Sequence, residues 1–277
     1  MSHLKDRVVV ITGAGGGFGR LIARKVAERG GRVAACDINE QELQLTVDEA
    51  IKAGGEALGL TADVTRPEDL AALVAATLEK FGHVDVMINN AGIMPLAYYS
   101  DHGAALDAWH RCIDINIKGV LNGIVAVHDA MMARGRGHIV NLSSIYSNYP
   151  VKGAAVYGAT KAAVNFLSES LRQESHGRIK VTTVRPTGIP ITGIASAVVN
   201  VEAAASIVGA NAEQYGARIE ALLEGRSEPD HVDPEKIEYF MLDPELLADQ
   251  ILYAIDQPWG VVISDLTVRS SGDLYVI

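Results

Sequence analysis

The sequence predicts an α/β fold in which a doubly wound parallel sheet lies between two layers of helices. From residue 7 onward, short apolar runs alternate with longer amphipathic patterns of helical period. Strands separated by helices form βαβ crossovers, and such crossovers build parallel sheets. Continuous apolar runs such as VVVIT are typical of strands covered on both faces. We therefore expect a three-layer α/β/α architecture in one domain, residues 1–277.

The predicted elements follow one another along the chain in a regular order. The expected strands span residues 7–12, 32–37, 56–63, 84–92, 138–144, 179–186 and 260–268. The expected helices span residues 20–30 and about 104–133, run from residue 40 to Gly54, begin at Pro67 and at Pro244, and include the region around 153–175. Glycine after a helical pattern and proline before one are the usual signals of a helix end and a helix start.

Residues 193–243 interrupt this alternation. The first half of this segment has a helical pattern, whereas the second half is polar and rich in turn residues, with Pro229 and Pro234. A segment of this length is unusual for a plain connection and typical of a functional cover. We expect it to be an inserted substrate lid.

Composition and charge exclude several classes of function. The chain is 48% hydrophobic and 21% charged, with a formal net charge of −10. An acidic chain without a basic run is a poor binder of nucleic acid, because that affinity comes from Lys and Arg. Two distant cysteines, Cys36 and Cys112, predict free buried thiols. The sequence shows neither a signal-peptide pattern nor an apolar run long enough to span a membrane, so we expect a cytoplasmic protein.

A glycine-rich loop joins the first predicted strand to the first predicted helix. The strict G-x-G-x-x-G pattern fails because Phe18 takes its last position, but Thr12-Gly13-x-x-x-Gly17-x-Gly19 is present. Glycines let the backbone approach a pyrophosphate, whose charge meets the amides of a helix N-terminus. This arrangement predicts a Rossmann-type dinucleotide site. A plain tight turn is the alternative.

Asp37 ends the second predicted strand, 18 positions after Gly19. A carboxylate there accepts hydrogen bonds from the ribose hydroxyls of NAD and repels the 2′-phosphate of NADP. Residues 13–19 contain neither Lys nor Arg to attract that phosphate. The sequence therefore favours NAD, with a strand-end aspartate that caps the next helix as the alternative.

Tyr157 and Lys161 are four residues apart in a helical segment, so their side chains share one face. Lowering a tyrosine pKa from about 10 to near 7 requires about 4 kcal/mol of preferential stabilisation of the phenolate. A cation ~4 Å away supplies about that much at an effective dielectric constant near 20. We expect Lys161 to lower the Tyr157 pKa and to prepare this tyrosine for proton transfer. A surface pair on an amphipathic helix is the alternative.

Four stretches together resemble the short-chain dehydrogenase/reductase family, in its common form of about 250 residues. They are the glycine loop, NNAG at 89–92, SS at 143–144 and YGATK at 157–161, in the family's order and spacing. The resemblance implies that Tyr157 is the general acid/base, that Lys161 activates it, and that Ser144 orients the substrate oxygen. It also implies that Asn116 holds a water linked to Lys161. An ordinary helix residue at Asn116 and a plain strand end at Ser144 remain the alternatives.

The resemblance also implies a set of cofactor contacts. These are Gly13, Gly17, Phe18, Gly19, Asp37, Asp63, Val64, Asn90, Ala91, Gly92, Tyr157, Lys161, Ile189 and Thr192. The chain departs from the family after the sixth strand, where Thr187 separates Pro186 from Gly188. Thr192 then falls one place later than the family's threonine, as expected for a one-residue insertion.

The function implied is NAD-dependent interconversion of a secondary alcohol and a ketone by hydride transfer. Met94, Ser144, Tyr146 and Tyr149 are the expected substrate contacts, and their mostly apolar character favours a neutral substrate. No metal is needed, and the family resemblance suggests a homotetramer. The alternatives are a non-catalytic NAD-sensing protein, an NADP-preferring carbonyl reductase, and a lyase or dehalogenase on the same scaffold.

Overall fold

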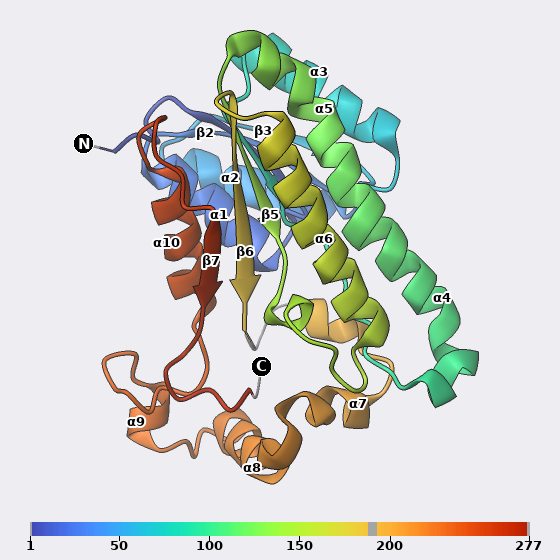
Figure 1. Cartoon of the computed structure of the whole chain (residues 1–277). Coiled ribbons are helices and arrows are strands. Elements are labelled where there is room, and N and C mark those ends of the chain that lie inside the picture. The colour runs from blue at the N-terminus through green and yellow to red at the C-terminus, as the bar shows by residue number, and fades with distance from the viewer. Residues whose placement is uncertain (1, 188–192, 276–277) are drawn as a thin grey trace.

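Seven strands in the described part of the chain form one parallel sheet (Figure 1). The computed structural model describes residues 2–187 and 193–275. The strand order is β3-β2-β1-β4-β5-β6-β7, and every neighbouring pair is parallel. The strands are β1 Val8–Thr12, β2 Arg32–Asp37, β3 Ala57–Thr61, β4 Val86–Asn89, β5 Gly137–Leu142, β6 Ile179–Pro186 and β7 Asp265–Val268. The predicted Rossmann-type sheet is confirmed.

Helices cover both faces of the sheet. The helices are α1 Gly17–Glu28, α2 Glu40–Lys52, α3 Pro67–Phe81, α4 His102–Ile113, α5 Gly119–Arg134, α6 Ala155–Glu174, α7 Val201–Ala205, α8 Ala212–Leu223, α9 Pro229–Val232 and α10 Pro244–Ile255. One buried core joins the sheet to α1, α2 and α10, and a second core joins it to α3, α5 and α6. Figure 1 shows these two groups on opposite sides of the strands.

The strand β1 shows why the apolar runs are continuous. Val9 and Ile11 point into the first core, whereas Val8 and Val10 point into the second. Successive side chains of a strand face opposite sides of the sheet, so a strand between two helical layers must be apolar at every position. The sequence pattern and the three-layer architecture thus have the same cause.

Most predicted elements agree with the structure, and two differ in ways that matter for function. The expected strand 84–92 ends at Asn89, because the chain then leaves the sheet at the NAG sequence. The expected helical region 104–133 is continuous, but a π-helical turn, Asp114–Lys118, separates α4 from α5. Such turns change the direction of side chains along a helix and are frequent at functional sites.

The carboxyl ends of the strands gather the segments that carry the motifs. β1 is the point at which the strand order reverses, since β2 lies on one side of it and β4 on the other. Ligands of such sheets bind outside the carboxyl ends at this switch point. The helices of the inserted segment, α7, α8 and α9, lie beyond the same edge, where the arrowheads of β6 and β7 point (Figure 1).

Two findings concern membrane-spanning helices and metal sites. Among the described residues, the helices are too short or too polar to cross a membrane. Within residues 2–187 and 193–275, His, Cys, Asp and Glu side chains form no group of three or more suited to a metal ion.

Candidate active site

The glycine loop is held in shape by the carboxylate of Asp37. One Asp37 oxygen accepts a hydrogen bond from the Gly15 amide at 2.8 Å, and the other accepts one from the Asn39 amide at 2.9 Å. Helix α1 begins after Gly16 without a side-chain cap, and its first turn contains no acidic residue. The free amides of such a helix start attract an anion, so the loop is suited to a pyrophosphate.

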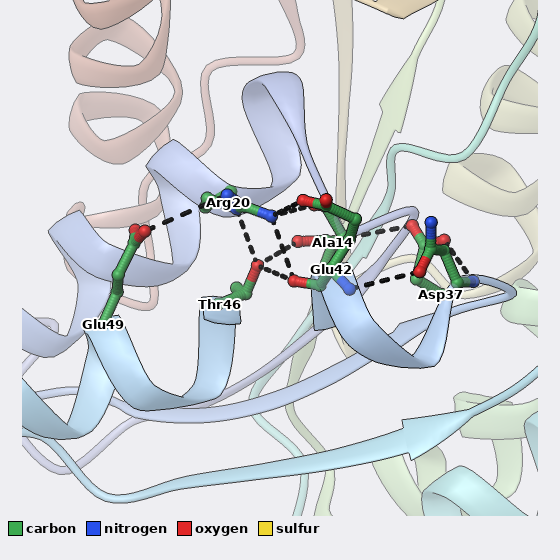
Figure 2. A network of polar contacts seen from close by, with 8 residues as sticks. Ala14, Arg20, Asp37, Glu42, Thr46 and Glu49 are labelled. Carbon is green, nitrogen blue, oxygen red and sulfur yellow. Dashed lines mark hydrogen bonds and ion pairs between the residues drawn. The ribbon is translucent and has the colours of Figure 1, made fainter. Parts of the chain in front are cut away.

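Arg20 ties this loop to α2 (Figure 2). Its guanidinium contacts the Gly15 carbonyl and the Glu42 carboxylate, and its Nε donates to the Thr46 hydroxyl at 3.1 Å. The Thr46 hydroxyl in turn donates to the Ala14 carbonyl at 2.7 Å. Arg20 was not among the predicted site residues because it lies one residue beyond the loop, although a cation one turn into the helix was a visible signal.

A groove of about 490 Å³ runs along the carboxyl edge from the glycine loop towards α4. Nine of the predicted cofactor residues line it, namely Gly13, Gly17, Phe18, Asp37, Asp63, Val64, Asn90, Ala91 and Gly92. Gly19 has a packing role instead, since a Cβ there would lie 2.3 Å from the Gly13 carbonyl oxygen. Ile189 and Thr192 fall outside the described residues, and Gly193 and Ile194, which follow them, line the groove.

Thr12 and Asn90 fix the switch point between β1 and β4. The Thr12 hydroxyl accepts hydrogen bonds from the amides of Asn90 and Ala91, and the Asn90 side chain donates to the carbonyls of Thr12 and Gly13. Gly13 has a φ of 63°, and a Cβ there would lie 2.8 Å from the Ala91 Cα. Only glycine fits this close crossing of the two chain segments.

The four predicted catalytic residues come together from three different elements. Tyr157 and Lys161 project from α6, Ser144 follows β5, and Asn116 lies in the π-helical turn. All four are buried, and Tyr157 is only 4% exposed. A Cβ on Gly92, which lines the groove, would lie 3.3 Å from Asn116 Oδ1 and 3.6 Å from Lys161 Nζ, so both side chains lie directly behind this glycine.

Burial sets the acid–base properties of the pair. It raises the pKa of the Tyr157 hydroxyl above its ordinary range, a hydrogen bond with Ser144 opposes this rise, and the Cys112 thiol adds to it. Burial also lowers the pKa of Lys161 to about 8, against a weaker opposing effect of Cys112. The sequence-based expectation of a lowered Tyr157 pKa is therefore wrong for the protein alone, because desolvation of the buried phenolate is the largest influence on this pKa.

Lys161 and Asn116 are each held by specific partners. Lys161 Nζ donates to the Leu142 carbonyl at 2.7 Å and lies 5.7 Å from the centre of the Tyr157 ring. Asn116 Oδ1 accepts from the Ile93 amide at 3.0 Å, and its Nδ2 donates to the Ile93 carbonyl at the same distance. These two bonds fix the orientation of the Asn116 amide.

Thr160 and Cys112 also belong to this arrangement, and neither was among the predicted site residues. Asn116 Nδ2 lies 3.1 Å from the Thr160 hydroxyl and 3.3 Å from Cys112 Sγ. The Thr160 hydroxyl donates to the Tyr157 carbonyl at 2.7 Å, so it links Asn116 to the helix that carries the tyrosine. The position of Thr160 just before Lys161 was the available signal.

Tyr157 belongs to a buried apolar cluster that also contains residues of the inserted segment, and we call it the cover cluster. Its members are Leu96, Cys112, Ile145, Tyr146, Ala154, Tyr157, Ala203, Ile207 and Val208, with Met94, Tyr98, Tyr215, Leu274 and Tyr275 among the residues packed against it. Of the predicted substrate contacts, Met94, Ser144 and Tyr146 lie here or directly beside it. Tyr149 lies apart from the cover cluster and is 68% exposed.

Comparison with known proteins gives consistent matches along the chain. Residues 7–203 match the family model described as short chain dehydrogenase. An uncharacterized oxidoreductase of Listeria monocytogenes is 35% identical over 96% of this chain and 96% of its own length. An uncharacterized oxidoreductase of Staphylococcus epidermidis is 30% identical over 97% of this chain and 99% of its own length.

Solved structures match over almost the whole chain as well. A variant of actinorhodin polyketide ketoreductase with NADPH is 31% identical, with a TM-score of 0.77 over 98% of this chain and 99% of that one. Levodione reductase is 25% identical, with a TM-score of 0.76 over 97% of both chains. The matches in sequence and in structure thus both extend over nearly the whole of the fold described above.

Proposed function

Because the chain belongs to the short-chain dehydrogenase family of oxidoreductases, we propose that it interconverts a secondary alcohol and a ketone with NAD as its cofactor. The observation that carries the proposal is the convergence of four buried side chains, Tyr157, Lys161, Ser144 and Asn116, behind Gly92, which lines a groove suited to a dinucleotide. When bound, the nicotinamide would accept hydride from the alcohol carbon or donate it to the ketone carbon.

In this proposal Tyr157 is the general acid/base. During ketone reduction its hydroxyl donates a proton to the substrate oxygen, and during alcohol oxidation the phenolate removes that proton. Ser144 holds the same oxygen by a hydrogen bond, which suits its contact with the Tyr157 hydroxyl. Lys161 favours the phenolate by its charge, and its pKa near 8 lets it exchange a proton close to neutral pH. Asn116 holds a water molecule that is linked to Lys161.

The preference for NAD rests on Asp37 and Arg20. Asp37 lines the groove next to Gly15, where its charge favours ribose hydroxyls and repels a 2′-phosphate. Arg20 is the cation nearest the loop in the network of Figure 2, and it is paired with Glu42 at 2.5 Å and with Glu49 at 4.0 Å. Its charge is therefore already balanced within the protein.

An NADP-preferring carbonyl reductase is the second candidate function. The actinorhodin ketoreductase structure contains NADPH, and a metagenomic short-chain oxidoreductase that is 27% identical was solved with NADP. If Arg20 left Glu42, its guanidinium would be available to a phosphate near Gly15.

Steady-state kinetics with both cofactors tests these proposals. We expect a panel of secondary alcohols to reduce NAD, with activity abolished in Tyr157→Phe. In Asp37→Ala, the loss of charged hydrogen bonds, at about 1.5–3 kcal/mol, should raise the KM for NAD roughly 10- to 100-fold. Asp37→Asn is the matched variant, since it removes the charge and keeps the shape, and it should mainly improve the use of NADP.

Three outcomes would contradict parts of this proposal. Wild-type turnover only with NADP would refute the role of Asp37 and leave the catalytic residues in place. Unchanged activity in Tyr157→Phe would refute the acid–base assignment. Tight NADH binding without turnover of any alcohol or ketone would favour a non-catalytic NAD-sensing protein.

We further propose that the chain is one domain with residues 193–243 as its substrate lid, and that it acts as a cytoplasmic homotetramer. The packing of Ala203, Ile207 and Val208 over Tyr157 supports the lid. Exposed Leu121, Val125 and Phe166 on α5 and α6 support contacts between subunits. The two free cysteines support a location in the cytoplasm, where thiols stay reduced. Light scattering after gel filtration tests the tetramer, and a dimer or monomer mass would contradict it.

A further inference from the structure

Tyr146 stands directly beside the proposed reacting groups. It lies two residues after Ser144 in the short turn Ile145–Ser147, and its amide donates to the Ser144 hydroxyl at 3.3 Å. Its ring packs edge-on against the ring of Tyr157, with centroids 5.4 Å apart and planes at 76°. The position of Tyr146 is therefore fixed relative to both catalytic side chains.

The hydroxyl of Tyr146 is buried without a hydrogen-bond partner among the described residues. The whole side chain is only 7% exposed. Burial raises the pKa of this hydroxyl above its ordinary range, so it stays neutral and can donate a proton in a hydrogen bond. Buried polar groups in native proteins are almost always paired, and an unpaired one calls for an explanation.

Two neighbouring tyrosines show what a paired hydroxyl looks like in the same region. The hydroxyls of Tyr215 and Tyr275 lie 3.4 Å apart, and their rings pack edge-on at 6.0 Å. Tyr275 is held in place by its neighbour Leu274, whose carbonyl accepts from the Asn211 side chain at 2.9 Å. These hydroxyls satisfy each other, whereas the Tyr146 hydroxyl has no hydrogen-bond partner among the described residues.

The surroundings limit the ligand to a neutral molecule. Leu96, Ile207 and Val208 pack around Tyr146 and Tyr157 in the cover cluster, and such apolar walls disfavour a charged group. A substrate whose reacting oxygen lies at Tyr157 and Ser144 would place its neighbouring carbons beside the Tyr146 ring. A second oxygen on one of those carbons would accept the free hydrogen bond.

We propose that Tyr146 recognises a second oxygen of the substrate, so that the preferred substrates are neutral diketones or hydroxyketones and the corresponding alcohols. This inference rests on the proposed function. The reaction at the first oxygen is unchanged, and the Tyr146 hydroxyl only donates a hydrogen bond to the second one. Tyr146 is thus a residue that determines specificity, separate from the proton transfer at Tyr157.

A matched series of ketones tests the proposal. The series contains one methyl alkyl ketone and the diketones of the same carbon count, with the second carbonyl one, two or three carbons away. We expect wild-type kcat/KM to be at least about tenfold higher for one diketone than for the monoketone, as one well-placed hydrogen bond allows. In Tyr146→Phe this ratio should fall about tenfold, whereas Tyr215→Phe, which removes a hydroxyl that already has a partner, should keep it.

Equal kcat/KM for the monoketone and every diketone in the wild type would overturn the proposal and leave the proposed function standing. An equal loss of the ratio in Tyr146→Phe and Tyr215→Phe would also overturn it. If no ketone turns over, the proposed function fails, and calorimetric binding of the same ketones in the presence of NADH then decides. Diketone binding weakened about tenfold only in Tyr146→Phe would support the inference, and unchanged binding would refute it.

Thermal stability gives an independent test. Removing a hydroxyl without a partner should leave the Tm of Tyr146→Phe unchanged or raise it, because no bond is lost. A clear fall in Tm, larger than that of Tyr215→Phe, would show that the hydroxyl has a partner within the chain. That result would overturn the proposal.

Discussion

Replacing Lys161 by methionine should stabilise the protein while abolishing its activity. Lys161 is 3% exposed, and the strongest influence on its pKa is loss of hydration. Lowering this pKa from 10.5 to about 8, at ~1.36 kcal/mol per unit, means that the buried ammonium lowers the free energy of unfolding by about 3 kcal/mol at pH 7. Methionine fills a similar volume without a charge.

The net gain is smaller than this figure because one hydrogen bond is lost. Lys161 Nζ donates to the Leu142 carbonyl at 2.7 Å, and such a bond is worth about 1 kcal/mol. We therefore expect Lys161→Met to be about 2 kcal/mol more stable than the wild type at pH 7. At about 2–4 °C per kcal/mol for a domain of this size, the Tm should rise by about 4–8 °C.

The pH dependence identifies the cause. Below pH 8 the lysine is protonated in both the folded and the unfolded chain, so it adds no slope to the stability curve. Between about pH 8 and 10.5 the unfolded chain binds the proton and the folded chain does not, so wild-type stability rises with pH relative to the variant. The gap in Tm between Lys161→Met and the wild type should therefore be largest near pH 7 and close towards pH 10.5.

Thermal melts of both proteins across this pH range, without cofactor, measure the effect. A variant less stable than the wild type at pH 7 would refute the reasoning, because the charged lysine would then be a stabilising group. A gap in Tm that stays constant from pH 7 to 10.5 would also refute it, since the difference would not come from the ammonium charge. Residual hydride transfer in the variant would contradict the proposed role of Lys161.

Two further predictions concern residues outside the motifs. Asp85 is buried and accepts from Arg134 Nη1 at 2.8 Å and from the Val8 amide at 3.0 Å, so Asp85→Ala should lower the unfolding free energy by about 2–3 kcal/mol in urea. Asp85 lies at the amino ends of the strands, so Asp85→Ala should leave the KM for the cofactor unchanged. A raised KM would contradict this placement. Thr160→Val removes the hydroxyl that joins Asn116 to Tyr157 and should lower kcat about 3- to 10-fold without changing KM. Thr160→Ser keeps a hydroxyl and should have the kcat of the wild type. A low kcat in Thr160→Ser would contradict the role of the hydroxyl.

The regular elements and the motif positions could be predicted from the sequence. β2 has the predicted bounds, Arg32–Asp37, and α3 starts at the predicted Pro67. Both depend on local properties, namely an apolar run that suits a buried strand and a proline that suits the first helical turn. The parallel direction of the strands also follows from local rules, because helical crossovers of this length join parallel strands, whereas the order of the strands was first given by the structure.

What the tertiary structure alone decided is the environment of each functional group. The sequence places Tyr157 and Lys161 one helical turn apart, but the sign of the Tyr157 pKa change depends on burial in the cover cluster, whose members include residues as distant along the chain as Val208. The π-helical turn at Asn116 and the pairing of Arg20 with Glu42 likewise depend on contacts between separate elements. Periodicity and spacing describe neighbours along the chain, whereas desolvation and hydrogen-bond partners depend on which distant segments meet in space.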